Sequence, residues 1–104
     1  MEKVIRHNKV AVLISPNFGA GWYSWNRSHP QLLFSAKIIW LVERNRRNEI
    51  TEEWVKENLN ISGVYCGGAN GLEIRWLPVG TVFEVKEDGG AERLLTLSDL
   101  VLVA

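Results

Sequence analysis

The run Lys-Val-Ala-Val-Leu-Ile-Ser at residues 9–15 constrains the fold of this chain more than any other stretch. It is almost continuously apolar and rich in β-branched residues, a pattern typical of a strand that is buried on both faces. Pro16 ends the run, because proline has no amide hydrogen to donate to a sheet. The sequence therefore predicts a strand that lies centrally in a sheet.

Two helices are predicted after this strand. Pro30 suits a first helical position, and no breaker follows it until residue 44, so a largely buried helix is expected over residues 30–44. A second helix is expected to begin at Thr51, whose hydroxyl can cap free amides, and to end near residues 58–60. Two glutamates follow Thr51 in the turn where negative charge is favoured.

After the second helix the apolar pattern changes to a period of two, which indicates strands. Gly- and Asn-containing turns separate these strands, including Asn70-Gly71 and Asp88-Gly89-Gly90. The expected strands are residues 63–66, 72–77, 81–86, 93–97 and 100–103. The predicted fold is α+β in a single domain over residues 1–104, with one central strand, two helices and then an antiparallel β-meander of four to five short strands. The last strand, if exposed at an edge, could pair with a second copy of the chain in a homo-oligomer.

Charge and composition limit the classes of partner. The 104 residues include 12 Lys plus Arg and 12 Asp plus Glu, so a formal net charge of zero gives no general attraction to extended nucleic acid. The single cysteine, Cys66, cannot close an internal disulfide, and no stretch resembles a secretory leader or a membrane span. A cytoplasmic protein without membrane contact is expected.

Catalytic and metal-binding patterns are not found in the sequence. His7 and His29 have no cysteine or acidic neighbour at a metal-ligand spacing, and no serine lies in a G-x-S-x-G context. Glu73 and Arg75 share one face of a predicted strand, where they form either a cross-strand charge pair, the favoured interpretation, or the polar floor of a pocket. Glu92 has the same two interpretations. We therefore expect no enzyme, no metal and no cofactor, and Glu73 and Glu92 are the only candidates for acid–base roles.

The most unusual segment is Gly-Ala-Gly-Trp-Tyr-Ser-Trp-Asn at residues 19–26, which joins a buried strand to a helix. Such loops can present amide donors to an anion, although neither nucleotide-binding spacing of glycines is matched. In one interpretation the aromatic residues fold back onto the core. In the other, Trp22 or Trp25 stacks on a flat ligand, and Asn26, which has no evident structural duty, recognises it through its amide. The candidate ligand-binding residues are Asn17, Phe18, Gly19, Gly21, Trp22, Trp25, Asn26, Arg27, Glu73 and Arg75.

The strand Ala-Val-Leu-Ile-Ser and the loop Gly-Ala-Gly-Trp-x-x-Trp-Asn are followed by a helix and by Leu-Glu-Ile, Val-Gly-Thr-x-Phe and Asp-Gly-Gly-Ala-Glu. Together these motifs resemble a family of small proteins encoded by bacteriophages and prophages. In that family the loop usually reads G-A-G-W-S-T-W-N and the late turn Y-D-G-[AS]-E. Here Tyr23-Ser24 fills the variable pair, and residues 87–92, Glu-Asp-Gly-Gly-Ala-Glu, contain an additional glycine and lack the aromatic residue. The resemblance covers most of the chain and implies a viral protein in the cytoplasm of a host cell rather than a particular activity.

Two functions of different classes follow from these features. In the first, the chain is a non-enzymatic phage-type binding protein that captures a small ligand, such as a nucleotide-derived defence signal, with the loop at residues 19–27. In the alternative, exposed tryptophans such as Trp22, Trp25 and Trp76 anchor the chain to a host or phage protein, which makes it an inhibitor or adaptor.

Overall fold

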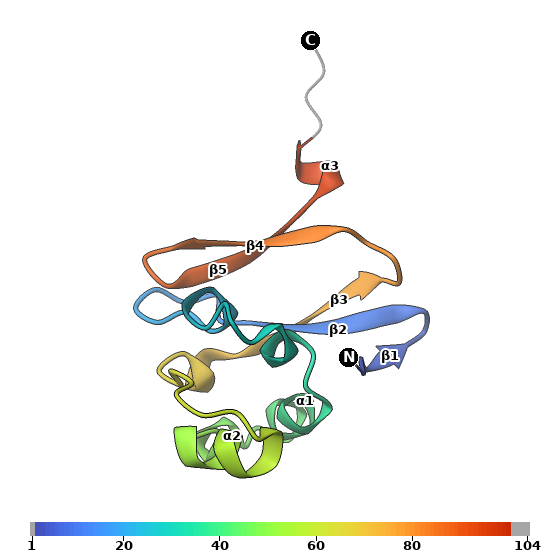
Figure 1. Cartoon of the computed structure of the whole chain (residues 1–104). Helices are drawn as coiled ribbons and strands as arrows, with labels where there is room; N and C mark the ends of the chain where they lie inside the picture. The colour runs from blue at the N-terminus through green and yellow to red at the C-terminus, as the bar shows by residue number, and fades with distance from the viewer. Residues whose placement is uncertain (1, 101–104) are drawn as a thin grey trace.

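The computed structural model describes residues 2–100, and the fold is α+β as predicted (Figure 1). Four short 3₁₀ turns lie between the regular elements, at Tyr23–Trp25, Pro30–Leu33, Arg47–Glu49 and Ala69–Gly71. In chain order the strands and helices are β1 (Ile5–Arg6), β2 (Lys9–Ile14), α1 (Ala36–Glu43), α2 (Glu52–Leu59), β3 (Glu73–Pro78), β4 (Phe83–Asp88), β5 (Ala91–Thr96) and α3 (Leu97–Leu100).

The strands form two antiparallel sheets. Strand β2 lies between β1 and β3 in one sheet, while β4 and β5 form a hairpin of their own. The central position of β2 is as predicted, but the later strands do not make one continuous meander, because β3 pairs with β2 and not with β4. Gly89 and Gly90 close the hairpin with φ values of 58° and 88°, a two-residue turn that requires left-handed backbone at both positions.

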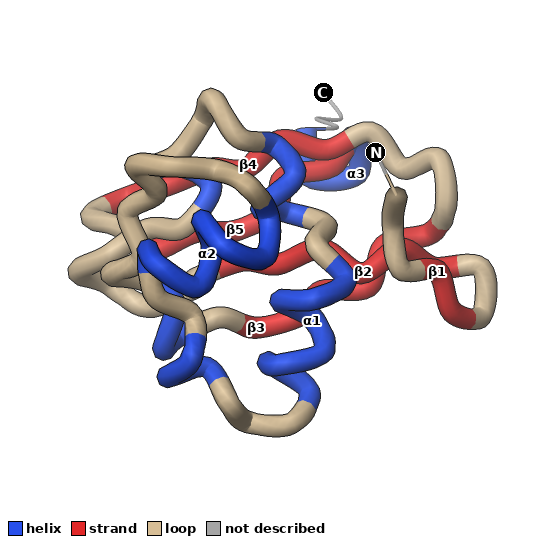
Figure 2. Tube along the Cα trace, turned by 60° about the horizontal axis from the view of Figure 1, so that its bottom comes forward, coloured by secondary structure: helices blue, strands red, loops and turns tan. Residues whose placement is uncertain are grey.

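Strand β2 is buried on both faces, as its sequence predicts. Ala11 and Leu13 belong to the main core, together with apolar residues of α1 and α2. Val12 points the other way, into a smaller core that includes Phe34 and Val85 of β4. Figure 1 shows the consequence, with α1 and α2 on one side of β2 and the β4–β5 hairpin, followed by α3, on the other; in Figure 2 the molecule is turned so that α1 and α2 come forward.

The first predicted helix is divided in two. Pro30 begins only a 3₁₀ turn, and Phe34 and Ser35 leave helical geometry before α1 begins. The division has a local cause, because the Ser35 side chain accepts a hydrogen bond from the amide of Ile38 at 3.3 Å and so caps a new helix. The second helix is confirmed: Thr51 caps α2 by accepting a bond from the amide of Trp54 at 3.1 Å.

Two of the predicted strands differ in the structure. The strand expected at residues 63–66 is wrong, since this segment is irregular and the backbone of Tyr65 bonds to a side chain instead of a neighbouring strand. Another strand is expected at residues 100–103. Leu100 is instead the last residue of α3, and residues 101–103 lie outside the described part of the chain. The short strand β1, which was not predicted, turns into β2 through His7 and Asn8, both with positive φ.

Candidate binding surface

The carboxylate of Glu92 is the polar centre of the loop that follows β2. Glu92 lies on β5 and is only 3% exposed. One of its oxygens accepts a hydrogen bond from the amide of Ser15 at 2.8 Å. The other accepts bonds from the amides of Trp22 at 2.9 Å and Ser24 at 2.8 Å, and from the Ser24 hydroxyl at 2.5 Å. The amide groups that the sequence suggested for an external anion are therefore satisfied by a carboxylate of the chain itself.

Close backbone contacts hold the same loop from two sides. The amide of Gly19 donates to the carbonyl oxygen of Gly89 at 2.8 Å, which joins the loop to the tip of the β4–β5 hairpin. A Cβ atom on Gly90 would lie 2.5 Å from the backbone nitrogen of Ala20, and one on Gly68 would lie 2.5 Å from the carbonyl oxygen of Gly21. Both glycines thus permit a backbone approach that no larger residue allows.

Trp22 is part of the core and not of the surface. Its side chain is 0% exposed, and its indole N–H donates to the carbonyl oxygen of Leu32 at 2.9 Å. The expectation that Trp22 presents a stacking face is therefore wrong, because the ring has no exposed face. For Trp22 the structure follows the alternative interpretation, in which the loop aromatic residues fold back onto the core.

Asn26 has a structural duty that the sequence did not reveal. It is 7% exposed, and its Nδ2 donates to the carbonyl oxygens of Trp22 and Tyr65, both at 2.9 Å. Its Oδ1 accepts from the amide of Tyr65 at 2.8 Å. The side chain therefore bonds both backbone groups of Tyr65 and joins the loop to a segment 39 residues further along the chain.

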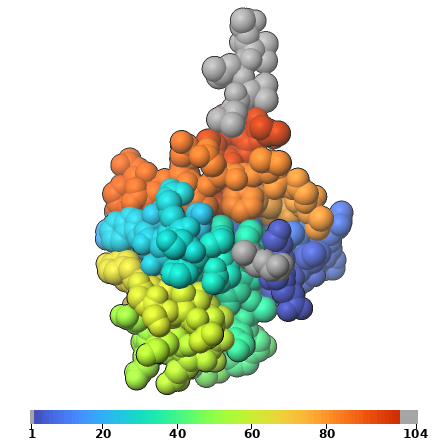
Figure 3. All heavy atoms as spheres, in the orientation of Figure 1, coloured from blue at the N-terminus to red at the C-terminus, as the bar shows by residue number. Residues whose placement is uncertain are grey.

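The aromatic residues that remain exposed lie around this fixed loop. Trp25 is 41% exposed and Tyr65 46%, and their ring centroids are 5.2 Å apart. The Trp25 indole N–H also bonds to Glu87 of β4. Phe18, which is 79% exposed, lies against Gly89 at the tip of the same hairpin. We call Phe18, Trp25 and Tyr65 the aromatic end; Figure 3 shows the loop, the segment around Tyr65 and the hairpin tip gathered at one end of the molecule.

The other predicted ligand-binding residues have diverse positions. Asn17, Gly19 and Arg27 are exposed on the loop, whereas Gly21 is buried. The guanidinium of Arg27 lies 5.6 Å from the centre of the Tyr23 ring.

Glu73 and Arg75 form an exposed ion pair at 3.1 Å. Both residues lie on β3, so the pair is within one strand and is not the cross-strand pair that was favoured.

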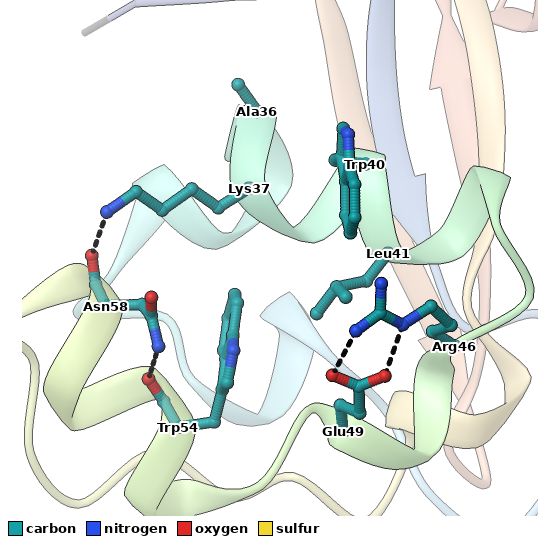
Figure 4. A pocket seen from close by; sticks show the side chains of 8 residues that line it. All are labelled: Ala36, Lys37, Trp40, Leu41, Arg46, Glu49, Trp54 and Asn58. Carbon is teal, nitrogen blue, oxygen red and sulfur yellow. Dashed lines mark hydrogen bonds and ion pairs between the residues drawn. The ribbon is translucent and has the colours of Figure 1, made fainter.

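A second surface feature escaped sequence analysis. A groove of about 470 Å³ lies between α1 and α2, lined by Trp40 of α1 and Trp54 of α2 (Figure 4). Lys37 crosses one end, where its ammonium group donates to the carbonyl oxygen of Asn58 at 3.0 Å. Both tryptophans lie in segments that were correctly expected to be helical, but their meeting depends on how the two helices pack.

Within residues 2–100 the structure offers little support for a reactive cysteine or a metal site. Burial, and secondarily the charge of Glu52, raises the pKa of the Cys66 thiol, which makes the reactive thiolate scarcer. In this part of the chain no group of three or more His, Cys, Asp and Glu residues is arranged to hold a metal ion. None of its helices has the length and apolar character needed to cross a bilayer.

Comparison with family models, curated proteins and solved structures finds no match to the chain.

Proposed function

We propose that this protein is a non-catalytic interaction module that docks its aromatic end onto another protein. The observation that carries the proposal is the exposed Trp25–Tyr65 pair, whose two segments are fixed by side chains: Glu92 bonds the backbone of the loop that carries Trp25, and Asn26 bonds the backbone of Tyr65. Tryptophan and tyrosine are the residue types most enriched at interface hot spots.

Rigidity is the physical reason why this end suits binding. An aromatic side chain on a mobile loop loses conformational freedom when it docks, and that loss weakens the complex. Here Asn26 fixes the backbone of Tyr65, and Glu87 bonds the indole of Trp25. A partner would therefore meet two aromatic rings that already hold their positions.

Capture of a nucleotide by the loop, the other function suggested by the sequence, has less support. The amides of Trp22 and Ser24 already donate to Glu92, and the ring of Trp22 is covered. A flat ligand at the loop would stack on the exposed Trp25–Tyr65 pair and not on Trp22. Trp25→Ala can test both functions, because the binding of a nucleotide and the binding of a partner protein are measured in separate experiments.

The resemblance to phage proteins suggests where the partner is found. As part of this proposal the protein acts in the cytoplasm of a bacterial host, and its partner is a host or phage protein that it blocks or recruits. Such stoichiometric action requires no catalytic group.

Replacement of Trp25 by alanine tests the proposal. The experiment captures partners from bacterial lysate with the wild type, identifies them, and measures the affinity of each purified partner. Trp25→Ala is expected to weaken binding by about 2 kcal/mol or more, roughly thirtyfold, as loss of a hot-spot tryptophan does.

Trp40→Ala is the matched control, because Trp40 is 45% exposed but lies on α1, outside the aromatic end. It should leave the affinity unchanged. Equal affinities of the wild type and Trp25→Ala for every purified partner would refute the proposal. Binding of a nucleotide that is lost in Trp25→Ala, without any protein partner, would instead favour the loop-ligand function.

A further inference from the structure

The α1–α2 groove combines two aromatic walls with an apolar floor. Trp40 and Trp54 line it from opposite helices (Figure 4), and Ala36 and Leu41 of α1 are its other apolar lining residues. Trp54 packs in part against the main core, whereas Trp40 is exposed. Flat, apolar surfaces on two sides favour a ligand that is itself flat, because planar rings stack on indole faces.

Positive charge surrounds these aromatic walls. The guanidinium groups of Arg44 and Arg46 lie 4.0 Å and 5.1 Å from the centre of the Trp40 ring. Arg46 is neutralised by Glu49, whose pKa it lowers through a hydrogen bond. Lys37 and Arg44 form no ion pair with a carboxylate in the part of the chain that the structure describes. Arg44 is not among the lining residues, and Arg46 is paired with Glu49, so the ammonium group of Lys37 is the charge in the groove lining that an anionic ligand would balance.

The dimensions indicate a small molecule. A volume of about 470 Å³ lies in the range of sites for drug-sized ligands, about 300–1,000 Å³. Lys37 and Asn58 at one end and Arg46 and Glu49 at the other give the groove two polar ends around an aromatic centre (Figure 4). The amide of Asn58, held by its bond to the carbonyl oxygen of Trp54 at 2.9 Å, offers hydrogen bonds to the edge of a ring.

We propose that the α1–α2 groove is a binding site for a free mononucleotide, with the base stacked against Trp40 and Trp54 and the phosphate beside Lys37. A nucleobase provides the flat ring and the polar edge, and the phosphate provides the negative charge. The site is separate from the aromatic end and does not depend on the function proposed for it. A long nucleic-acid strand is a poorer fit, because the chain has no net positive charge to attract a polyanion.

The indole N–H signals in an NMR spectrum of the ¹⁵N-labelled protein provide the test. Each of the five tryptophans gives one such signal, which replacement by phenylalanine assigns. Titration with AMP, GMP, CMP and UMP is expected to give, for at least one of them, saturable shifts of the Trp40 and Trp54 signals, while the signal of buried Trp22 stays in place. Trp40→Ala should weaken this binding about tenfold or more, as loss of a stacking partner does.

Charge reversal tests the place of the phosphate. Lys37→Glu is expected to weaken mononucleotide binding about tenfold, a loss of affinity that one charged hydrogen bond can account for. It is expected to leave the affinity for the corresponding nucleoside unchanged. Lys86→Glu on β4, an exposed lysine outside the groove, is the control and should bind as the wild type does.

Three results would overturn the proposal. The first is no saturable shift of the two groove signals with any mononucleotide, and the second is an equal shift of all five indole signals. The third is tighter binding of an oligonucleotide than of the mononucleotide it contains, which would assign the groove to a strand. Unchanged affinity of Lys37→Glu would overturn the position of the phosphate.

Discussion

Replacement of Glu92 by alanine is expected to lower the free energy of unfolding by about 3–5 kcal/mol, because two buried backbone amides, a partly buried amide and a hydroxyl lose their acceptor together. The amides belong to Ser15, Trp22 and Ser24. Each unsatisfied buried donor costs about 1–3 kcal/mol, and part of that cost is recovered if water enters the space. Denaturant unfolding, followed by the combined fluorescence of the five tryptophans, measures the change.

Two further variants identify the cause of this loss. Glu92→Gln preserves the volume but turns an NH₂ group toward an amide donor, so it is also expected to unfold at a lower denaturant concentration than the wild type. Glu84→Ala on β4 removes an exposed glutamate and should stay within about 0.5 kcal/mol of the wild type. If Glu92→Ala were as stable as Glu84→Ala, the carboxylate would not be holding the loop.

Replacement of Asn26 by alanine is expected to lower the free energy of unfolding by about 2–3 kcal/mol, since three hydrogen bonds to two backbone segments are lost. The sequence alone favours the opposite result, because it shows no structural duty for Asn26. The structure changes that expectation because the amide is buried and all three of its bonds are to the backbone of the chain. Thermal and denaturant unfolding of the purified variant provide the measurement.

A matched pair of variants separates the role of this side chain from that of the loop. Asn17→Ala removes an exposed asparagine from the same loop and is expected to be near neutral. Asn26→Asp keeps the acceptor for the amide of Tyr65 but places a carboxylate oxygen against the carbonyl oxygens of Trp22 and Tyr65, so it is also expected to be less stable than the wild type. A wild-type midpoint for Asn26→Ala would show that these bonds contribute nothing measurable.

The regular elements that depend on short-range patterns could be predicted from the sequence. The run at residues 9–15 specifies β2, because continuous apolar character needs cover on both faces, and both cores supply it. Thr51 and the two glutamates after it specify the start of α2. Gly89 and Gly90 specify the hairpin turn, since both positions have left-handed backbone.

The candidate surface could not be derived from the sequence in the same way, because its interactions join distant residues. Glu92 lies 70 residues beyond the Trp22 amide that it accepts from, and no local pattern connects them. The structure shows that the glutamate of the late Gly-Ala-Glu turn accepts hydrogen bonds from the amides of Ser15, Trp22 and Ser24.

Competition between local and distant partners explains the remaining differences. The sequence predicts a strand around Tyr65, but the side chain of Asn26 takes both of its backbone groups and leaves none for a neighbouring strand. The helix expected over residues 30–44 is interrupted because Ser35 caps α1 from within that range. The α1–α2 groove depends on the packing of two helices, which periodicity within each helix does not determine.

Hydrogen exchange of individual amides tests most directly the central claim that the carboxylate of Glu92 closes the loop. If the claim is right, the amides of Trp22 and Ser24 exchange as slowly as those of buried β2 residues such as Leu13, because they open only when much of the core opens. Exposed Phe18, on the same loop, should exchange much faster. Exchange of Trp22 and Ser24 as rapid as that of Phe18 would contradict the account.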